Sequence, residues 1–328
     1  MPHPATYNSE KAGASPHLGS AMKRAMISCL LALLLGFLLF FPETALSCAR
    51  DGLVLWYRNL VPVLFPFLIL SNLIIRLNCI DGLLKLIHPL FHLIWGTSVY
   101  GSYAILAGFL FGCPMGAKVT GDLRKQELIC QEEARYLVSF VNNLSPAFLI
   151  TFLVRENLQA PALTGPTLCI LYGAPLLTGL VFMPRYRTAI RSFSEKKKAS
   201  KVPLKLELID ACLFDGIVTI AKMGGYIVMF SVTAGALRLL PFFGTTVRNI
   251  LSASLEITAG IQTVTQLSLT FPAKYLCLML LCSFGGICAL MQTLSVFPMD
   301  RLTIRQYFRA KALTACLCLL FTSILLFL

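Results

Sequence analysis

Apolar residues form long uninterrupted runs along most of this chain, and the polar positions gather between them. Eight runs come near the roughly 20 residues that a helix needs to cross a bilayer. They lie at 26–41, 52–75, 99–116, 137–154, 160–183, 216–240, 274–297 and 311–328. We therefore predict an all-α polytopic membrane protein, with most of these runs as spanning helices.

Composition agrees with this prediction. The chain is 57% hydrophobic and 13% charged, with a mean hydropathy of +0.76, whereas soluble domains are about 45–50% apolar and about 25% charged. The formal charge of +13 would suggest nucleic acid in a soluble protein. Here the basic residues lie in loops, where they orient the chain and contact lipid headgroups. We expect the lipid bilayer as a partner and no nucleic acid.

Charge and polarity divide the chain into four parts. Residues 1–25 form a polar tail, predicted to be cytoplasmic, and 26–41 a retained anchor helix. Residues 26–183 are a first membrane half, 184–210 a basic linker and 211–328 a second half. The linker is predicted to be cytoplasmic by the positive-inside rule.

The two halves resemble each other weakly. "DGLVLWYRNLVP" begins at Asp51 and "DGIVTIAKMGG" at Asp215, and each has a base seven residues later, Arg58 or Lys222. Counting spans from a cytoplasmic N-terminus gives seven spans and two re-entrant segments, 99–116 and 250–268. The stretch 83–95 is a surface helix or a further span. The halves are then inverted repeats with broken or re-entrant helices, an arrangement found in transporters.

The sequence "GCPMG" at 112–116 interrupts an apolar run. Non-helical backbone survives at membrane depth only when it is buried in protein or lines a wet cavity. Gly112, Pro114 and Gly116 are therefore candidate binding positions, and the alternative is a turn without a ligand.

Polar residues gather in corresponding places of both halves. A carboxylate inside an apolar segment is costly and usually functional, so Glu256 is the first candidate for a coupling proton or sodium site. The alternative is a solvated helix end. Asn142 and Asn143 are candidates for binding or, alternatively, for contacts between helices. The remaining substrate-binding candidates are Ser145, Thr258, Gly260, Ser283, Gly285, Gly286 and Gln292.

Arg58 and Lys222 are candidate anion contacts, because their positions match and arginine suits carboxylate recognition. The alternative is snorkelling from helix ends. The twelve cysteines lie mostly in apolar runs without a CxxC pair. Neither nucleotide-binding nor hydrolase motifs occur in the sequence. We expect no enzymatic activity, no metal and no cofactor.

Four ordered motifs resemble the sporulation integral membrane proteins of the YlbJ type, which carry the nucleoside-recognition (Gate) domain twice. The motifs are "GCPMGAK" with "DLR", "NNLSP", "EITAG" and "SFGGICALMQ". Cys113 replaces an aromatic residue, and Leu144-Ser145 stands where Ser-Gly is usual. The resemblance covers about residues 25–328.

The resemblance implies a membrane protein of endospore formation that moves dipicolinic acid across the outer forespore membrane. The Gate domains of this family are similar to parts of concentrative nucleoside carriers. We expect a transporter of a small organic anion working by alternating access, and a homo-oligomer is a further partner to consider. The rival interpretations are a carrier of nucleosides or other small solutes, and a membrane scaffold that transports nothing.

Overall fold

A computed structural model describes residues 16–77, 79–85, 87–194, 205–239 and 244–327. These ranges hold helices and no strand. Part of the predicted tail and linker, residues 1–15 and 195–204, lies outside them. The helices long and apolar enough to cross a membrane within the described ranges are Pro42–Arg76, Pro161–Arg185, Leu206–Leu239, Phe271–Val296 and Arg301–Phe327, and a bent pair raises their number from five to at most six. The chain is an all-α polytopic membrane protein, with fewer uninterrupted spans than the seven predicted.

The chain divides into two units, Met1–Leu46 and Ser47–Leu328. The first unit contains α1 (Pro16–Phe40) and the beginning of α2 (Pro42–Leu55). Leucines of α1 such as Leu33 and Leu35 are exposed. In a bilayer such side chains meet lipid tails that are equally apolar, so their exposure carries no penalty. The predicted helix at 26–41 lies within α1 except for its last residue.

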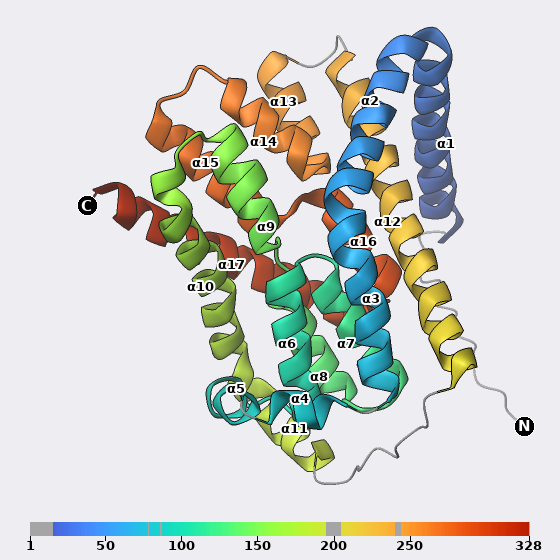
Figure 1. Ribbon diagram of the computed structural model, residues 1–328. Coiled ribbons are helices and arrows are strands. Elements are labelled where there is room, and N and C mark those ends of the chain that lie inside the picture. Colours follow the sequence, from blue (N-terminus) through green and yellow to red (C-terminus); the bar gives the residue numbers. More distant parts are fainter. Residues whose placement is uncertain (1–15, 78, 86, 195–204, 240–243, 328) are drawn as a thin grey trace, which may run out of the picture. The chain divides into compact units, whose positions relative to one another are not determined.

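In the second unit, α2 continues through a π-helical turn, η1 (Trp56–Leu60), into α3 (Val61–Arg76). Two short helices follow at the end of α3, α4 (Ile80–Leu84) and α5 (His88–Trp95). α5 meets the next helix at an angle of 93°. The stretch predicted as a surface helix or a span is thus a pair of short helices, drawn at the lower end in Figure 1.

The first hairpin consists of α6 (Val99–Phe111) and α7 (Met115–Lys125). α6 runs from the α4–α5 end toward the middle of the unit, and α7 returns beside it (Figure 1). The turn begins at Gly112, whose φ of +81° is one that side-chain-bearing residues rarely adopt. The predicted break within 112–116 is confirmed, and the re-entrant path of 99–116 stays a prediction.

The next segment crosses the middle without a continuous helix. α8 (Gln131–Val138) ends early, residues 142–145 are non-helical, and the chain becomes helical again in α9 (Pro146–Phe148) and η2 (Leu149–Asn157). The prediction of one spanning helix over 137–154 is wrong, because it overlooked this break. Pro146 begins the second piece, as expected for a residue that lacks an N–H donor.

Two long helices connect the halves. After η3 (Pro161–Leu163), α10 (Thr164–Phe182) returns to the end where α4 and α5 lie, and η4 (Met183–Arg185) and α11 (Arg187–Ser194) follow there. α12 (Leu206–Leu239) then runs the whole length of the unit (Figure 1).

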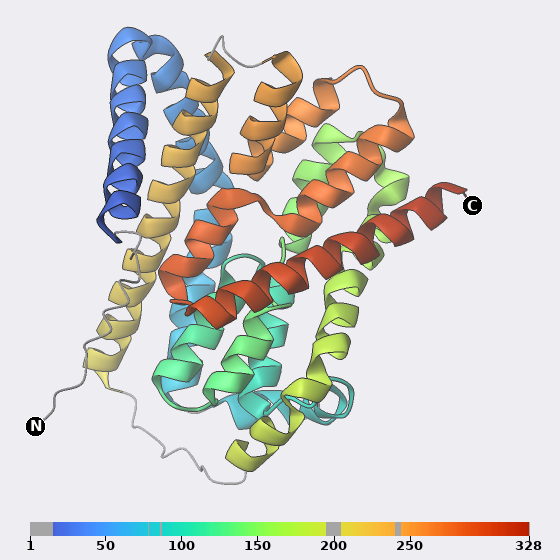
Figure 2. The ribbon, with the colours of Figure 1, turned by 180° about the vertical axis from the view of Figure 1, so that it is seen from behind.

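The second half repeats this order of elements. A hairpin of α13 (Thr245–Leu255) and α14 (Ile257–Gln266) enters from the opposite end and turns at Glu256 (Figures 1 and 2). α15 (Phe271–Phe284) and α16 (Gly286–Val296) form a second broken span, which is interrupted at Gly285, where φ is +93°. The segment 250–268, predicted to dip in and return, contains the turn of this hairpin, and its path through the bilayer stays a prediction.

The last helix, α17 (Arg301–Phe327), begins ten residues before the predicted run at 311–328. The sequence analysis placed no helix over the basic residues at its start. Lys311 lies inside the helix bundle with 6% of its surface exposed. Arg301, Arg305 and Arg309, spread over the first nine residues of α17, hid the beginning of this helix in the hydropathy pattern.

Close backbone packing fixes the position of the first hairpin and its tip. A Cβ atom at Gly108 or Gly116 would overlap the carbonyl oxygen of Val141, so both arms of the first hairpin pack against the chain just before the break. A Cβ atom at Gly112 would meet the backbone nitrogen of Ser145. The tip of the hairpin is therefore held against the non-helical segment, and this brings the first two breaks together.

Candidate functional site

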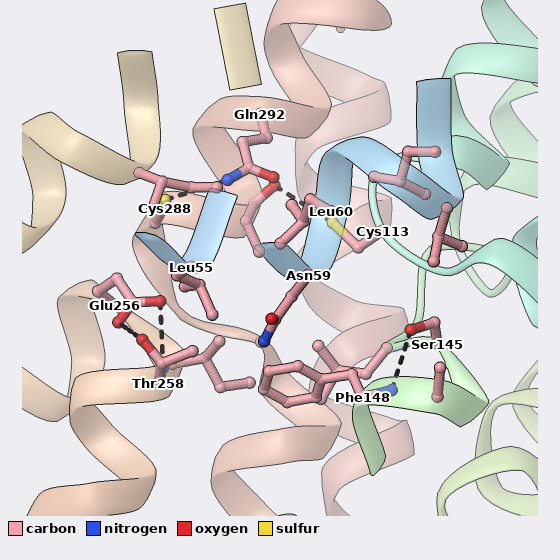
Figure 3. Close-up of a pocket in the computed structure, with 18 of the residues that line it drawn as sticks. Leu55, Asn59, Leu60, Cys113, Ser145, Phe148, Glu256, Thr258, Cys288 and Gln292 are labelled. Atoms are coloured by element: carbon pink, nitrogen blue, oxygen red, sulfur yellow. Dashed lines mark hydrogen bonds between the residues drawn. The ribbon is translucent and has the colours of Figure 1, made fainter. Parts of the chain in front are cut away.

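All four breaks line one cavity of about 400 Å³. The tip of the first hairpin contributes Cys113, the second break Ser145, the tip of the second hairpin Glu256 and the last break Gly285. The bend of α2 into α3 closes a further side. Figure 3 shows Cys113, Ser145 and Glu256 around a common space. Drug-sized ligand pockets in proteins commonly have volumes of about 300–1,000 Å³.

Glu256 is the carboxylate in this wall. It has 3% of its surface exposed, and its side chain accepts the backbone N–H groups of Thr258 at 3.1 Å and Ala259 at 2.8 Å, and the hydroxyl of Thr258. It is therefore the N-cap of α14, where a negative charge is stabilised by the free N–H groups and by the helix dipole. The alternative of a solvated helix end does not fit this burial.

Uncharged polar groups complete the lining. Gln292, from the second turn of α16, donates to the sulfur of Cys288 at 3.2 Å. Asn59 projects from the π-helical turn η1 into the space between Glu256 and Ser145 (Figure 3). Ser145 caps α9, because its hydroxyl accepts the N–H of Phe148 at 3.3 Å. Such groups can orient a polar ligand in an otherwise apolar pocket.

A second cavity of about 480 Å³ adjoins the first and shares residues such as Asn59, Glu156 and Glu256 with it. It lies toward the end of the unit where α12 and the second hairpin meet. Its wall is charged, with Arg50, Asp51, Arg58 and Arg238 as its remaining ionisable side chains. The first cavity thus adjoins a charged space toward one end of the unit.

Several predicted residues build the site without lining it. Those that pack or brace the breaks are Gly112, Pro114, Gly116, Asn142, Asn143, Gly260, Ser283 and Gly286. Asn143 donates to the carbonyl of Phe140 at 2.7 Å, and Ser283 to that of Leu280 at 2.8 Å. Lys222 is exposed on α12 and lines neither cavity, in contrast to Arg58.

Asn142 joins a buried polar cluster below the cavity. Its amide nitrogen lies 2.6 Å from the hydroxyl of Thr293 and 3.4 Å from that of Tyr307. The ammonium of Lys311 donates to its backbone carbonyl at 2.8 Å. The alternative interpretation of Asn142 as a contact between helices agrees with these bonds.

A charged cluster lies between the first cavity and the end where α4, α5 and α11 lie. Lys118 of α7 has 3% of its surface exposed and contacts Asp122 at 2.7 Å and Asp215 of α12 at 2.6 Å. Asn72 of α3 donates to the same Asp215 oxygen at 2.7 Å. These bonds tie the first hairpin to α3 and α12, and Asn72, Asp122 and Asp215 also line a further cavity of about 400 Å³ at this end.

The sequence analysis missed three features of the site. Asn59 was detectable as the only polar side chain between Arg58 and Ser71 in an apolar helix. Glu156 and Arg238 lie at the ends of apolar runs. A charged residue in such a position is normally interpreted as facing solvent. Lys311 had no local signal, because its burial depends on breaks more than 25 residues away in sequence.

Comparison with known proteins gives one informative match. No family model matches the chain, and no solved structure matches it. The curated "Sporulation integral membrane protein YlbJ" of Bacillus subtilis (strain 168) is 24% identical over 319 residues, which cover 87% of this chain and 78% of that protein. The predicted resemblance to YlbJ-type proteins is therefore confirmed. The duplicated Gate domain stays a prediction.

Proposed function

We propose that this protein is a membrane transporter of sporulating cells that moves a small organic anion by alternating access between two inverted halves. Dipicolinic acid is the first substrate to test, and the outer forespore membrane is the proposed location. The resemblance to YlbJ supports the link to sporulation. We further propose that the protein catalyses no chemical reaction.

One observation carries this proposal, namely that four helix breaks line a single cavity. A break frees backbone groups that are costly to leave unpaired in hydrocarbon, so breaks persist where they line a site. Broken helices from two related halves that meet near the middle of the membrane are typical of secondary transporters. A membrane scaffold has no comparable need for four breaks around one space.

The electrostatics of the site favour an anion. The N-terminus of α14 donates hydrogen bonds to the Glu256 carboxylate, so its charge repels an incoming anion less than an unpaired carboxylate would. α16 begins at the cavity wall after Gly285 and has no side-chain cap, so its first N–H groups remain available to a negative group. Arg58 and Arg238 line the adjoining space and can attract an anion from solution.

Alternating access also needs one closed end. The buried Lys118, paired with Asp122 and Asp215, joins the first hairpin to α12 between the first cavity and the further cavity that these two carboxylates line. This supports a state that is open toward the second hairpin and closed toward the first. In the reverse state we expect the Lys118 cluster to separate, because it joins the first hairpin to α12.

Uptake of dipicolinate and uridine into cells that express the protein tests the proposal. We expect saturable accumulation of dipicolinate that is lost in Asn59→Leu, whose apolar side chain of similar size faces the cavity. Loss of one polar ligand contact corresponds to about 10-fold or more in affinity. Tyr57→Leu, two residues away on the same turn and lining neither cavity, is the matched control.

The rival functions give different results in the same assay. Uridine accumulation without dipicolinate accumulation would support a nucleoside carrier. Accumulation of neither compound, with both variants present in the membrane at wild-type levels, would support a scaffold.

A further inference from the structure

Lys311 is a buried cation without an acidic partner among the described residues. It lies in the third turn of α17 with 6% of its surface exposed. The ion pairs of the described chain leave it out. A buried ammonium normally needs a carboxylate or several strong acceptors, so its actual partners indicate its role.

Those partners are backbone carbonyls from the two broken spans. The ammonium donates to the carbonyl oxygen of Asn142 at 2.8 Å and lies 3.5 Å from that of Ser283. Asn142 lies in the break between α8 and α9, and Ser283 is two residues before the break at Gly285. Lys311 therefore connects the corresponding break of each half.

Asn142 and Tyr307 bring further polar atoms to this region of the bundle. The Oδ1 atom of Asn142 is buried and has no hydrogen-bond partner. The hydroxyl of Tyr307 lies within reach of the Asn142 amide, and the Lys311 nitrogen is 5.9 Å from the centre of the Tyr307 ring. Unwound carbonyls and helix C-termini of this kind coordinate Na⁺ in transporters that have broken helices.

We propose that the Lys311 ammonium takes the place of a coupling sodium ion, so that the protein carries its own cation at the junction of the two broken spans. The consequence is transport that needs no sodium. The two breaks are then held together by a cation that is covalently attached to the chain. The part of this inference that concerns coupling rests on the proposed transport function. The part that concerns the cation site does not, because sodium binding can be tested without a transported substrate.

Removal of the ammonium should turn the junction into a sodium site. Lys311→Met leaves the carbonyls of Asn142 and Ser283 without the ammonium donor, while the Oδ1 atom of Asn142 has no donor even in the wild type. Hard cations prefer such oxygen ligands. Lys311→Arg retains a positive charge, and Lys205→Met removes an exposed lysine ahead of α12 as the matched control.

The test compares melting temperatures of the purified full-length proteins in sodium chloride and in choline chloride. We expect the wild type, Lys311→Arg and Lys205→Met to melt at the same temperature in both salts. Lys311→Met should melt at a lower temperature in choline chloride than in sodium chloride. The gain in sodium should be about 2–4 °C when the sodium concentration is 10 to 100 times the dissociation constant of sodium for the variant. A sodium gain in the wild type as large as in Lys311→Met, or a folded Lys311→Met without a sodium gain, would overturn the inference.

A second variant and a second measurement complete the test. Lys311→Gln repeats the substitution with a polar side chain, in case the methionine variant does not fold. Should neither fold, a sodium response of the wild type alone still decides against the inference, and its absence supports it. Wild-type vesicles that take up dipicolinate only with a sodium gradient would also contradict it. A sodium-responsive Lys311→Met alongside vesicles that take up nothing would support the cation site and count against the proposed transport.

Discussion

Gly260→Ala is a sharp test of how the second hairpin holds the site together. Gly260 lies on α14 and faces α13 at the point where the two arms of the hairpin approach each other. An added Cβ atom would lie 2.8 Å from the carbonyl oxygen of Ala253 and 3.0 Å from its Cα atom. These are backbone atoms, which cannot rotate away as a side chain can.

The expected cost follows from this geometry. Ordinary van der Waals contact begins at 3.4 Å, so the hairpin arms must separate by about 0.6 Å, the difference between 3.4 and 2.8. Overpacking by one methyl group typically costs about 1–3 kcal/mol, and the better helix propensity of alanine returns at most about 1 kcal/mol. We expect a net loss of about 1–2 kcal/mol at Gly260.

Gly225→Ala is the matched control, because a Cβ atom at Gly225 of α12 has no neighbour within 4 Å. The same change should there stabilise the helix by up to about 1 kcal/mol. The two variants should therefore differ by about 2–3 kcal/mol. With an unfolding entropy of about 2.1 cal/mol/K per residue, that corresponds to about 3–5 °C in melting temperature.

The assay is thermal unfolding of the purified protein together with dipicolinate uptake in cells. Gly260→Ala should melt lower than Gly225→Ala and should also take up less, because α14 carries the cap residue of the cavity, Glu256. Equal melting temperatures for the two variants would refute the close approach of α13 and α14. A lower melting temperature with normal uptake would refute the link between this hairpin and the site.

Three further predictions concern ionisable groups. Glu256→Gln should cost about 1 kcal/mol of stability as a weaker cap and should reduce uptake at normal protein levels; unchanged uptake would exclude the carboxylate from the mechanism. Asp215→Asn removes a half-exposed partner of Lys118, and we expect the buried Cys212 to react several-fold faster with an impermeant maleimide, measured by mass spectrometry. Burial raises the pKa of Glu133 from 4.5 to about 7, despite a bond from the Ser98 N–H, so the folded state favours the protonated form. The contribution of protonated Glu133 to the free energy of unfolding is complete below pH 4.5 and is lost as pH rises through 7. This loss amounts to at most about 3 kcal/mol. The melting temperature of Glu133→Gln should lack this pH dependence.

The sequence predicted the helical membrane class and both hairpins for physical reasons. Long apolar runs can only be helices in a bilayer, because backbone groups must pair within the segment. The hairpin turn at 112–116 was visible because glycine and proline mark departures from the helix. The segment 250–268 was predicted to dip in and return from the count of spans, but the position of its turn at Glu256 was not predicted.

The break after Val138 was harder to predict. The run at 137–154 contains no glycine, and its two asparagines are equally compatible with a helix that packs against polar neighbours. Only the first hairpin explains the break, because Gly108 and Gly116 pack against the carbonyl of Val141 and leave no room for a helix there. Such a contact joins residues far apart in sequence, and the local signal for the break is Pro146, which begins the second helical piece.

The same reasoning explains why Lys311 is important to the choice between a transporter and a scaffold. Within hydrocarbon, each unpaired backbone group and each buried charge costs several kcal/mol. The bundle contains four breaks and a lysine without a carboxylate partner among its described residues, and the lysine lies where carbonyls of two breaks converge. A rigid scaffold would be more stable with continuous helices and an apolar residue at this position. Selection for movement around a binding cavity accounts for both costs, since a break can act as a hinge and the ammonium can hold two mobile pieces in register.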